Sequence, residues 1–195
     1  MEYRLNKQSL LDELKQWNHF LRRKVHLIAC GGTALTLLDI KASTKDVDFM
    51  VPLDADYRYL VSTLKSLGYE SSTASGWKRK DSPFVFDLFR GKRIHTTELL
   101  ESPLEEERHI LIKEFSHLYV GILNSYDLIT SKLFRGARVD FEDCLMLVKA
   151  QREEIDLDHL KEHYSLLASY DVSEKKILKH LDYFMEILKT EGLDD

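Results

Sequence analysis

One stretch, Ala29 to Val51, constrains the fold more than any other part of the chain. It reads ACGGTALTLLDIKASTKDVDFMV. An apolar run, VHLIAC, stops at Gly31-Gly32, which predicts a buried strand that turns sharply at its end. The segment TALTLLDI then offers good helix formers, with Thr33 placed to cap a short helix. DVDFMV alternates acidic and apolar residues before Pro52, which predicts a strand with one polar face.

The remaining elements of the first part also follow from periodicity. Apolar residues recur at helical spacing over residues 7–22 and 55–67, which predicts two amphipathic helices, the first with Ser9 and Asp12 as a candidate cap. GWKRKDSPFVFDLFRG reads as two strands joined by a turn, and HILIKEF and LYVGIL read as two more strands.

After Ser125 the pattern becomes helical. YDLITSKLFRGARVDFEDCLMLVKAQ predicts a helix interrupted near Gly136, and LDHLKEHYSLLASY and SEKKILKHLDYFMEILK predict two further amphipathic helices. The sequence therefore predicts an α+β fold, in which a mixed β-sheet with flanking helices over residues 1–123 is followed by a helical part over residues 124–195.

Composition excludes several classes of protein. The chain is 44% hydrophobic and 31% charged, and it contains no run of about 18 apolar residues, so a membrane span is not expected. Its N-terminus lacks the basic and apolar regions of a secretory signal. Cys30 and Cys144 lie in apolar company, which favours buried free thiols over a disulfide. We therefore expect a cytoplasmic protein.

A net charge of −5 argues against a protein that coats nucleic acid in general. Basic residues cluster at 78–80 and at Arg90, Lys92 and Arg93. These clusters are equally consistent with a solvated hairpin surface and with a patch that binds a phosphate or an RNA end.

The two aspartates of DVDFMV are candidate metal ligands. Residues i and i+2 of a strand share a face, so Asp46 and Asp48 project together while Val47 and Phe49 enter the core. Two carboxylates this close repel each other unless a cation lies between them, and Mg²⁺ prefers oxygen ligands of this kind. The alternative is a solvent-facing strand whose acids simply repel.

Two further features favour the metal interpretation. Gly31-Gly32-Thr33 at a strand end would let backbone N–H groups approach a phosphate closely. Asp87 lies in FVFDLF, a strand too apolar for a surface. If that strand lies beside the strand of Asp46 and Asp48, the three carboxylates converge. The alternative for Asp87 is an N-cap or an ion pair with Arg90 or Lys80.

These motifs in this order resemble the polymerase-β-type nucleotidyltransferase superfamily. GGTAL followed by STKDVDFMV is similar, within that superfamily, to the AbiEii-type toxins of type IV toxin–antitoxin systems. SYDLITSKLFRGARVDFEDCLML resembles the helical segment of that class, and the likeness covers roughly residues 25–150. The Gly-Ser turn and Arg of the antitoxin-paired minimal nucleotidyltransferases are absent from this sequence.

The resemblance implies roles for individual residues. Asp46 and Asp48 would coordinate Mg²⁺ or Mn²⁺, and Asp87 would be a third ligand or the general base. Gly31, Gly32 and Thr33 would hold the triphosphate. The same likeness implies two site residues in the helical segment. Lys132 would neutralise the phosphates of the nucleotide, and Asp143, less specifically, would help to bind the nucleotide.

Other polar residues of the helical part have ordinary explanations. Asp140 and Asp143 lie one turn apart beside Arg135 and Arg138, which equally fits a helix salt-bridge network. Tyr126 could stack on a base or simply pack. The pair His159 and His163 lacks a third ligand nearby, so zinc is not expected.

The predicted function is transfer of a nucleoside monophosphate from an NTP to an acceptor hydroxyl, with release of pyrophosphate. The acceptor would be an RNA 3′ end, such as that of tRNA, or a protein hydroxyl, and an antitoxin would be a further partner if the chain is a toxin. Two alternatives stay open: a nucleotide-binding regulatory module without turnover, and a nucleotidyltransferase that modifies small molecules, as antibiotic-modifying enzymes do.

Overall fold

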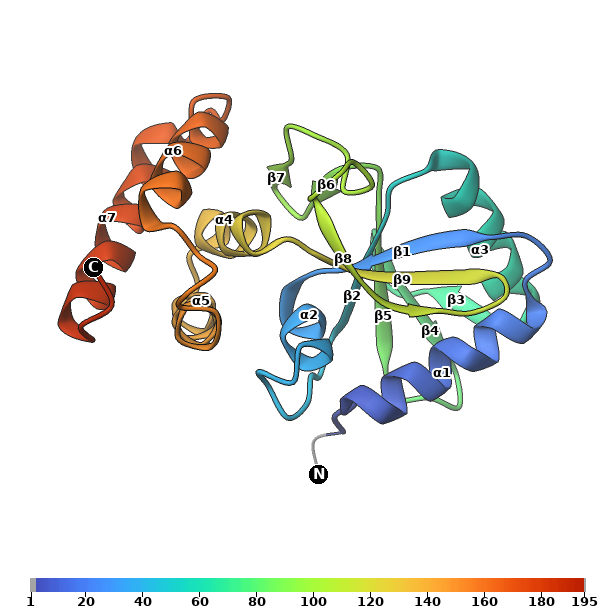
Figure 1. The fold of residues 1–195 in the computed structure, drawn as a ribbon. Coiled ribbons are helices and arrows are strands. Elements are labelled where there is room, and N and C mark those ends of the chain that lie inside the picture. The colour runs from blue at the N-terminus through green and yellow to red at the C-terminus, as the bar shows by residue number, and fades with distance from the viewer. Residues whose placement is uncertain (1–2, 195) are drawn as a thin grey trace. The chain divides into compact units, whose positions relative to one another are not determined.

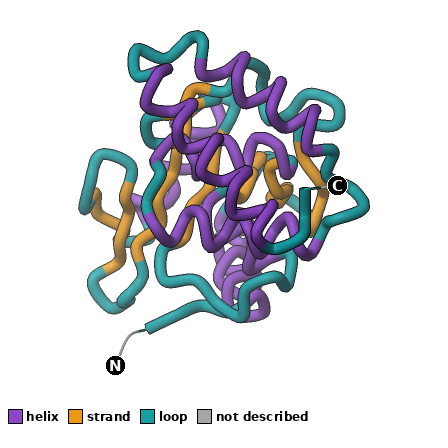
Figure 2. The backbone as a smooth tube through the Cα atoms, turned by 90° about the vertical axis from the view of Figure 1, so that its left-hand side faces the viewer, coloured by secondary structure: helices purple, strands orange, loops and turns teal. Residues whose placement is uncertain are grey.

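The structure is a computed structural model that describes residues 3–194 of the chain. The chain divides into two compact units, Met1–Leu123 and Asn124–Asp195. Every described strand lies in the first unit, and the regular elements described in the second unit are helices. Figure 2 colours the helices, strands and loops of the described chain. The predicted α+β fold, with a mixed sheet, flanking helices and C-terminal helices, is confirmed.

A seven-stranded mixed sheet forms the centre of the first unit (Figure 1). Its strand order is β3-β4-β5-β2-β1-β9-β8. Strand β1 pairs parallel with β9, and β2 pairs parallel with β5, whereas the other pairs are antiparallel. A separate two-stranded sheet joins β6 and β7. The strand bounds are β1 Val25–Ala29, β2 Val47–Val51, β3 Tyr69–Ser71, β4 Gly76–Arg79, β5 Val85–Arg90, β6 Arg93–Ile94, β7 Thr97–Glu98, β8 His109–Glu114 and β9 Leu118–Leu123.

Three helices accompany the sheet of the first unit: α1 Lys7–Phe20, α2 Gly31–Leu37 and α3 Asp54–Ser66. Helix α1 packs on the sheet through Trp17, whose ring lies 4.8 Å from that of Phe86 and whose Nε1 donates to the Tyr69 hydroxyl at 3.0 Å. Helix α3 packs against β1 and β3, and α2 packs against β2 and β9. The helix predicted over 7–22 is therefore present and ends two residues earlier, and the helix predicted over 55–67 is present and shifted by one residue.

Two predicted helix caps are wrong. The side chain of Asn6, not that of Ser9, caps α1 by accepting a hydrogen bond from the Ser9 N–H at 2.9 Å. Helix α2 begins after Cys30, which makes no side-chain capping bond, and Thr33 is fully buried in the first turn. The hydroxyl of Thr33 is engaged by the neighbouring strand instead, as shown below for the site.

The second unit contains helices α4 Ser125–Arg135, α5 Arg138–Ala150, α6 Leu157–Ala168 and α7 Glu174–Thr190. The predicted interruption is present at Gly136, which has φ +65° and whose N–H bonds the carbonyl of Lys132. A Cβ at Gly136 would collide with the ring of His180, so the turn needs glycine both for its backbone and for space.

Both cysteines are buried free thiols, as predicted. Burial raises the pKa of the Cys144 thiol, since the charged thiolate would lose its hydration there. Within residues 3–194, none of the helices has the length and apolar character that crossing a bilayer requires.

Candidate active site

Asp48 and Asp87 lie side by side in the sheet. Asp48 is on β2, Asp87 is on β5, and the two residues are direct partners in this parallel pair. Partners in such a pair project to the same face of the sheet, so both half-buried carboxylates point to one side. Asp46 precedes β2 by one residue and is exposed, while Val47 and Phe49 are fully buried. The Asp87 strand does lie beside the Asp48 strand, but Asp46 precedes β2 and does not share its face as predicted, so the pairing brings together two of the three predicted carboxylates.

The glycine turn lies directly against this acidic strand. Gly31 has φ +57°, and a Cβ added there would fall on the carboxylate Oδ2 of Asp48, with Asp48 Cγ at 3.1 Å. The Cys30 N–H also bonds the Asp48 carbonyl at 3.1 Å. Glycine is therefore required at position 31 for two reasons: its left-handed backbone and the space that the Asp48 side chain occupies.

Two threonine hydroxyls hold the backbone of the acidic segment. The Thr33 hydroxyl accepts from the Asp48 N–H at 2.9 Å and donates to the Asp46 carbonyl at 3.2 Å. The Thr44 hydroxyl donates to the same carbonyl at 2.7 Å. Both threonines are buried. Thr33 thus uses its hydroxyl on the protein backbone, which leaves only backbone groups of Gly31-Gly32-Thr33 to face a phosphate. Thr44 carries no sequence signal of this role, because a threonine before a strand is a common feature.

Asp87 has a hydrogen-bond donor that the sequence did not indicate. The Ser75 hydroxyl donates to Asp87 Oδ1 at 2.6 Å. Arg90, one of the two cations considered as a partner of Asp87, pairs with Asp54 instead. Ser75 lies in the loop between β3 and β4, and its only sequence signal was its place in a hydroxyl-rich segment, SSTAS.

The donor set suits a hard divalent cation. Mg²⁺ in such sites takes one or two protein carboxylates, and substrate phosphates and water complete the octahedron. Asp48 and Asp87 supply two carboxylates on one face, with the exposed Asp46 two residues away. Among residues 3–194 no three His, Cys, Asp or Glu side chains are gathered closely enough to bind a metal by themselves. The residues present therefore fit an ion that arrives with its nucleotide.

Lys132 and Asp143 lie in the second unit, where they bind each other. The Lys132 Nζ donates to Asp143 Oδ2 at 2.7 Å and lies 3.9 Å from Asp140 Oδ1. Asp140 also accepts a hydrogen bond from Arg135 Nε at 2.8 Å. The side chains of Lys132, Asp140 and Asp143 are between 0 and 6% exposed. The salt-bridge network considered as an alternative is thus present in part, since Arg135 pairs with Asp140 whereas Arg138 pairs with Glu142 and Asp143 pairs with Lys132.

The other candidate binding residues of the helical unit have structural partners. The ring of Tyr126 packs against that of His159 with centroids 4.7 Å apart, and its hydroxyl accepts from the Asp156 N–H. His163 Nε2 bonds the buried Asp127 at 2.8 Å. These contacts account for all three aromatic side chains without a ligand.

Several residues of the two basic clusters are used within the protein. Arg79 pairs with Asp81 at 2.6 Å. Lys92 donates to the carbonyl of Leu100, and Arg93 donates to that of His95. The clusters are therefore less available to a phosphate backbone than the sequence suggested.

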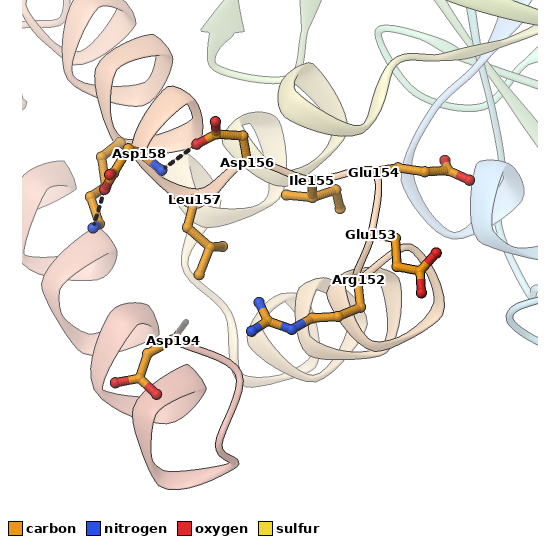
Figure 3. A pocket seen from close by; sticks show the side chains of 9 residues that line it. Arg152, Glu153, Glu154, Ile155, Asp156, Leu157, Asp158 and Asp194 are labelled. Carbon is orange, nitrogen blue, oxygen red and sulfur yellow. Dashed lines mark hydrogen bonds and ion pairs between the residues drawn. The ribbon is translucent and has the colours of Figure 1, made fainter.

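A pocket of about 320 Å³ lies in the second unit (Figure 3). It is lined by residues 152–158, Lys161 and Asp194. Acidic side chains outnumber basic ones there, and Arg152 already donates to the carbonyl of Leu193 at 2.9 Å. None of the predicted site residues lines it, and its charge does not suit a triphosphate.

Comparison with known proteins decides the class. Residues 8–191 match the family described as "Nucleotidyltransferase of unknown function (DUF6036)". The chain belongs to this nucleotidyltransferase family. The predicted superfamily and the predicted enzyme class, a nucleotidyltransferase, are thereby confirmed.

Two solved structures are similar to this nucleotidyltransferase. One is a candidate nucleotidyltransferase from Thermotoga maritima, with 16% identity, a TM-score of 0.47, and coverage of 78% of this chain and 98% of the other. The second is ANT(2″)-Ia in complex with adenylyl-2″-tobramycin, with 14% identity, a TM-score of 0.45, and coverage of 91% and 96%. No curated protein matches the sequence.

Proposed function

We propose that this nucleotidyltransferase transfers a nucleoside monophosphate from an NTP to an acceptor hydroxyl in a reaction that depends on Mg²⁺ or Mn²⁺. The observation that carries the proposal is the direct pairing of Asp48 and Asp87 on β2 and β5. Residues 1–123 form the catalytic core in this proposal, and residues 124–195 form a helical subdomain.

The residues of the core have distinct roles in the proposed reaction. Asp46 and Asp48 would hold the divalent cation, which would neutralise charge on the phosphates and on the leaving group. The backbone at Gly31-Gly32-Thr33 faces the triphosphate. The acceptor oxygen attacks the α-phosphorus. The bond between the α-phosphorus and the oxygen that bridges it to the β-phosphate breaks, and pyrophosphate leaves. Asp87 takes the proton of the acceptor hydroxyl or would act as a third ligand of the cation, in which case the proton passes to solvent water.

The AbiEii-type likeness supports two further roles in the helical unit. Lys132 would neutralise the phosphates of the nucleotide, and Asp143 would take part in nucleotide binding. Because Lys132 is already paired with Asp143, this role requires their ion pair to open or to be shared with the nucleotide. The same likeness supports a role as a toxin that acts in the cytoplasm. This toxin would modify an RNA 3′ end, such as that of tRNA, and would be controlled by an antitoxin protein.

The test is transfer of label from each α-³²P-labelled NTP in the presence of Mg²⁺. Total RNA, a protein lysate and a polyhydroxylated small molecule are offered as separate acceptors. Asp48→Asn and Asp87→Asn keep the side-chain shape. Each is expected to reduce transfer at least about 100-fold, Asp87→Asn because it removes an acid–base group and Asp48→Asn because it weakens the hold on the cation. Asp81→Asn is the matched control, because Asp81 is exposed and pairs with Arg79 away from the acids.

Transfer that survives in the Asp48→Asn variant refutes the proposal. Nucleotide binding without pyrophosphate release, with every acceptor, favours the regulatory module instead. Label found on RNA, protein or the small molecule then identifies the acceptor class.

A further inference from the structure

The loop between β3 and β4 is built so that it ends against the third carboxylate. The Ser72 N–H bonds the Gly76 carbonyl at 2.8 Å, and the Gly76 N–H bonds the Thr73 hydroxyl at 2.7 Å. A Cβ at Gly76 would lie 2.5 Å from the Thr73 Oγ1 and 2.9 Å from the Ser72 Oγ. A side chain at position 76 would therefore push the loop away, so the loop closes tightly only because glycine stands there.

Ser75 is attached to β5 at two points. Its carbonyl accepts from the Leu88 N–H at 2.9 Å, and its hydroxyl donates to Asp87 Oδ1 at 2.6 Å. The register agrees, since Gly76 is the β4 partner of Asp87. Because its backbone is held beside Leu88, the hydroxyl of Ser75 has a defined direction toward the carboxylate.

We propose that Ser75 is the positioning residue that orients the carboxylate of Asp87 for nucleotidyl transfer. The rotation of a carboxylate about its last side-chain bond is only weakly restricted by its own chain. A donor on Oδ1 selects one orientation and leaves Oδ2 for the cation or the acceptor hydroxyl. Among the described residues, no second hydrogen bond to the Asp87 carboxylate is present, so Ser75 is what orients it. This inference rests on the proposed function.

Kinetics of three loop variants test the inference. In Ser75→Ala we expect kcat to fall at least about tenfold while KM for the nucleotide changes less than about twofold, because the lost group orients a catalytic residue and does not touch the nucleotide. Ser75→Thr keeps a hydroxyl and should recover most of the loss. Thr73→Ala removes the loop's own bond to Gly76 but leaves both bonds between Ser75 and β5, so it should keep a kcat near that of the wild type.

A second measurement does not depend on turnover. Mn²⁺ binding, followed by electron paramagnetic resonance with a non-hydrolysable NTP analogue present, should weaken several-fold in Ser75→Ala and remain unchanged in Thr73→Ala. If no acceptor is ever labelled by the wild type, the proposed function fails, and Mn²⁺ binding alone then decides the role of Ser75. If the wild type turns over and Ser75→Ala equals it in both kcat and Mn²⁺ affinity, the inference fails and the proposed function stands.

Three other outcomes also overturn the inference. Equal losses in Ser75→Ala and Thr73→Ala would mean that the loop only supports the fold. Absence of Mn²⁺ binding by the wild type would remove the cation whose geometry Ser75 is proposed to serve. A nucleotide adduct on wild-type Ser75, detected by intact-protein and peptide mass spectrometry, would make this serine an acceptor instead of a positioning residue.

Discussion

Replacement of Gly31 by alanine tests the central contact of the site. Three effects act on this variant. Alanine at φ +57° costs about 1–2 kcal/mol relative to glycine, because its Cβ crowds the following carbonyl. The loss of chain entropy in the unfolded state returns about 0.4–1 kcal/mol. The Cβ also displaces the Asp48 carboxylate, which costs about another 0.5–1.5 kcal/mol if the side chain leaves its rotamer.

Gly68 provides the matched control. It has φ +82°, and a Cβ added there would meet no atom within 4 Å. Gly68→Ala therefore carries the backbone cost alone, so we expect Gly31→Ala to be about 1 kcal/mol less stable than Gly68→Ala in urea unfolding followed by circular dichroism. In an Asp48→Ala background the clash with the carboxylate is gone, and the new Cβ at position 31 would lie 3.4 Å from the Cβ that residue 48 keeps, an ordinary contact. The extra 1 kcal/mol should then disappear.

The effect on activity should be larger than the effect on stability. A displacement of about 1 Å at a reacting group costs about 100-fold in rate, so Gly31→Ala should lose at least that factor in nucleotidyl transfer while Gly68→Ala remains near the wild type. Equal stability of Gly31→Ala and Gly68→Ala, or an excess cost that persists without the Asp48 carboxylate, would refute the contact. Full activity in Gly31→Ala would refute its importance for the site.

Two further predictions concern the second unit. Asp143→Ala leaves the buried Lys132 ammonium without its nearest partner and should destabilise the protein by about 3 kcal/mol in urea unfolding. Glu142→Ala removes an exposed ion pair and should cost less than about 1 kcal/mol. Equal costs would contradict a buried charge network. Burial raises the pKa of Tyr164 and that of Cys144, so the unfolded chain releases these protons at lower pH than the folded protein does. The free energy of unfolding should therefore be unaffected by these groups at neutral pH and fall as the pH rises from about 9. Tyr164→Phe should make this alkaline decline of the unfolding free energy shallower. An unchanged slope would show that Tyr164 titrates normally.

The long elements of this fold could be predicted from the sequence, and the shortest could not. Helix α7 and strand β5 carry enough residues to display their period. Strands β3, β6 and β7 contain only two or three residues each, too few for any period. They form because a neighbouring strand offers hydrogen-bond partners. The cap of α1 was misplaced for a related reason, since Asn6 and Ser9 are both good capping residues and only the backbone conformation selects between them.

In the second unit, too, the helices could be predicted from the sequence and the contact between them could not. The sequence placed Lys132 and Asp143 on helical segments but did not show that they would meet. They lie on α4 and α5, and the turn at Gly136 returns the chain so that Nζ and Oδ2 come within 2.7 Å. A pair of this kind depends on how two helices pack, which no local pattern encodes.

By itself, the sequence determined the class of the fold, the acidic strand after a glycine turn, and the residue types of a nucleotidyltransferase. Local patterns suffice for these, because burial and backbone preference act on neighbouring residues. Only the tertiary structure decided that Asp48 pairs with Asp87, that Gly31 makes room for the Asp48 carboxylate, and that Ser75 bonds the third acid. Each of these contacts joins segments distant in the chain, so its geometry depends on strand register and loop closure and not on any one segment.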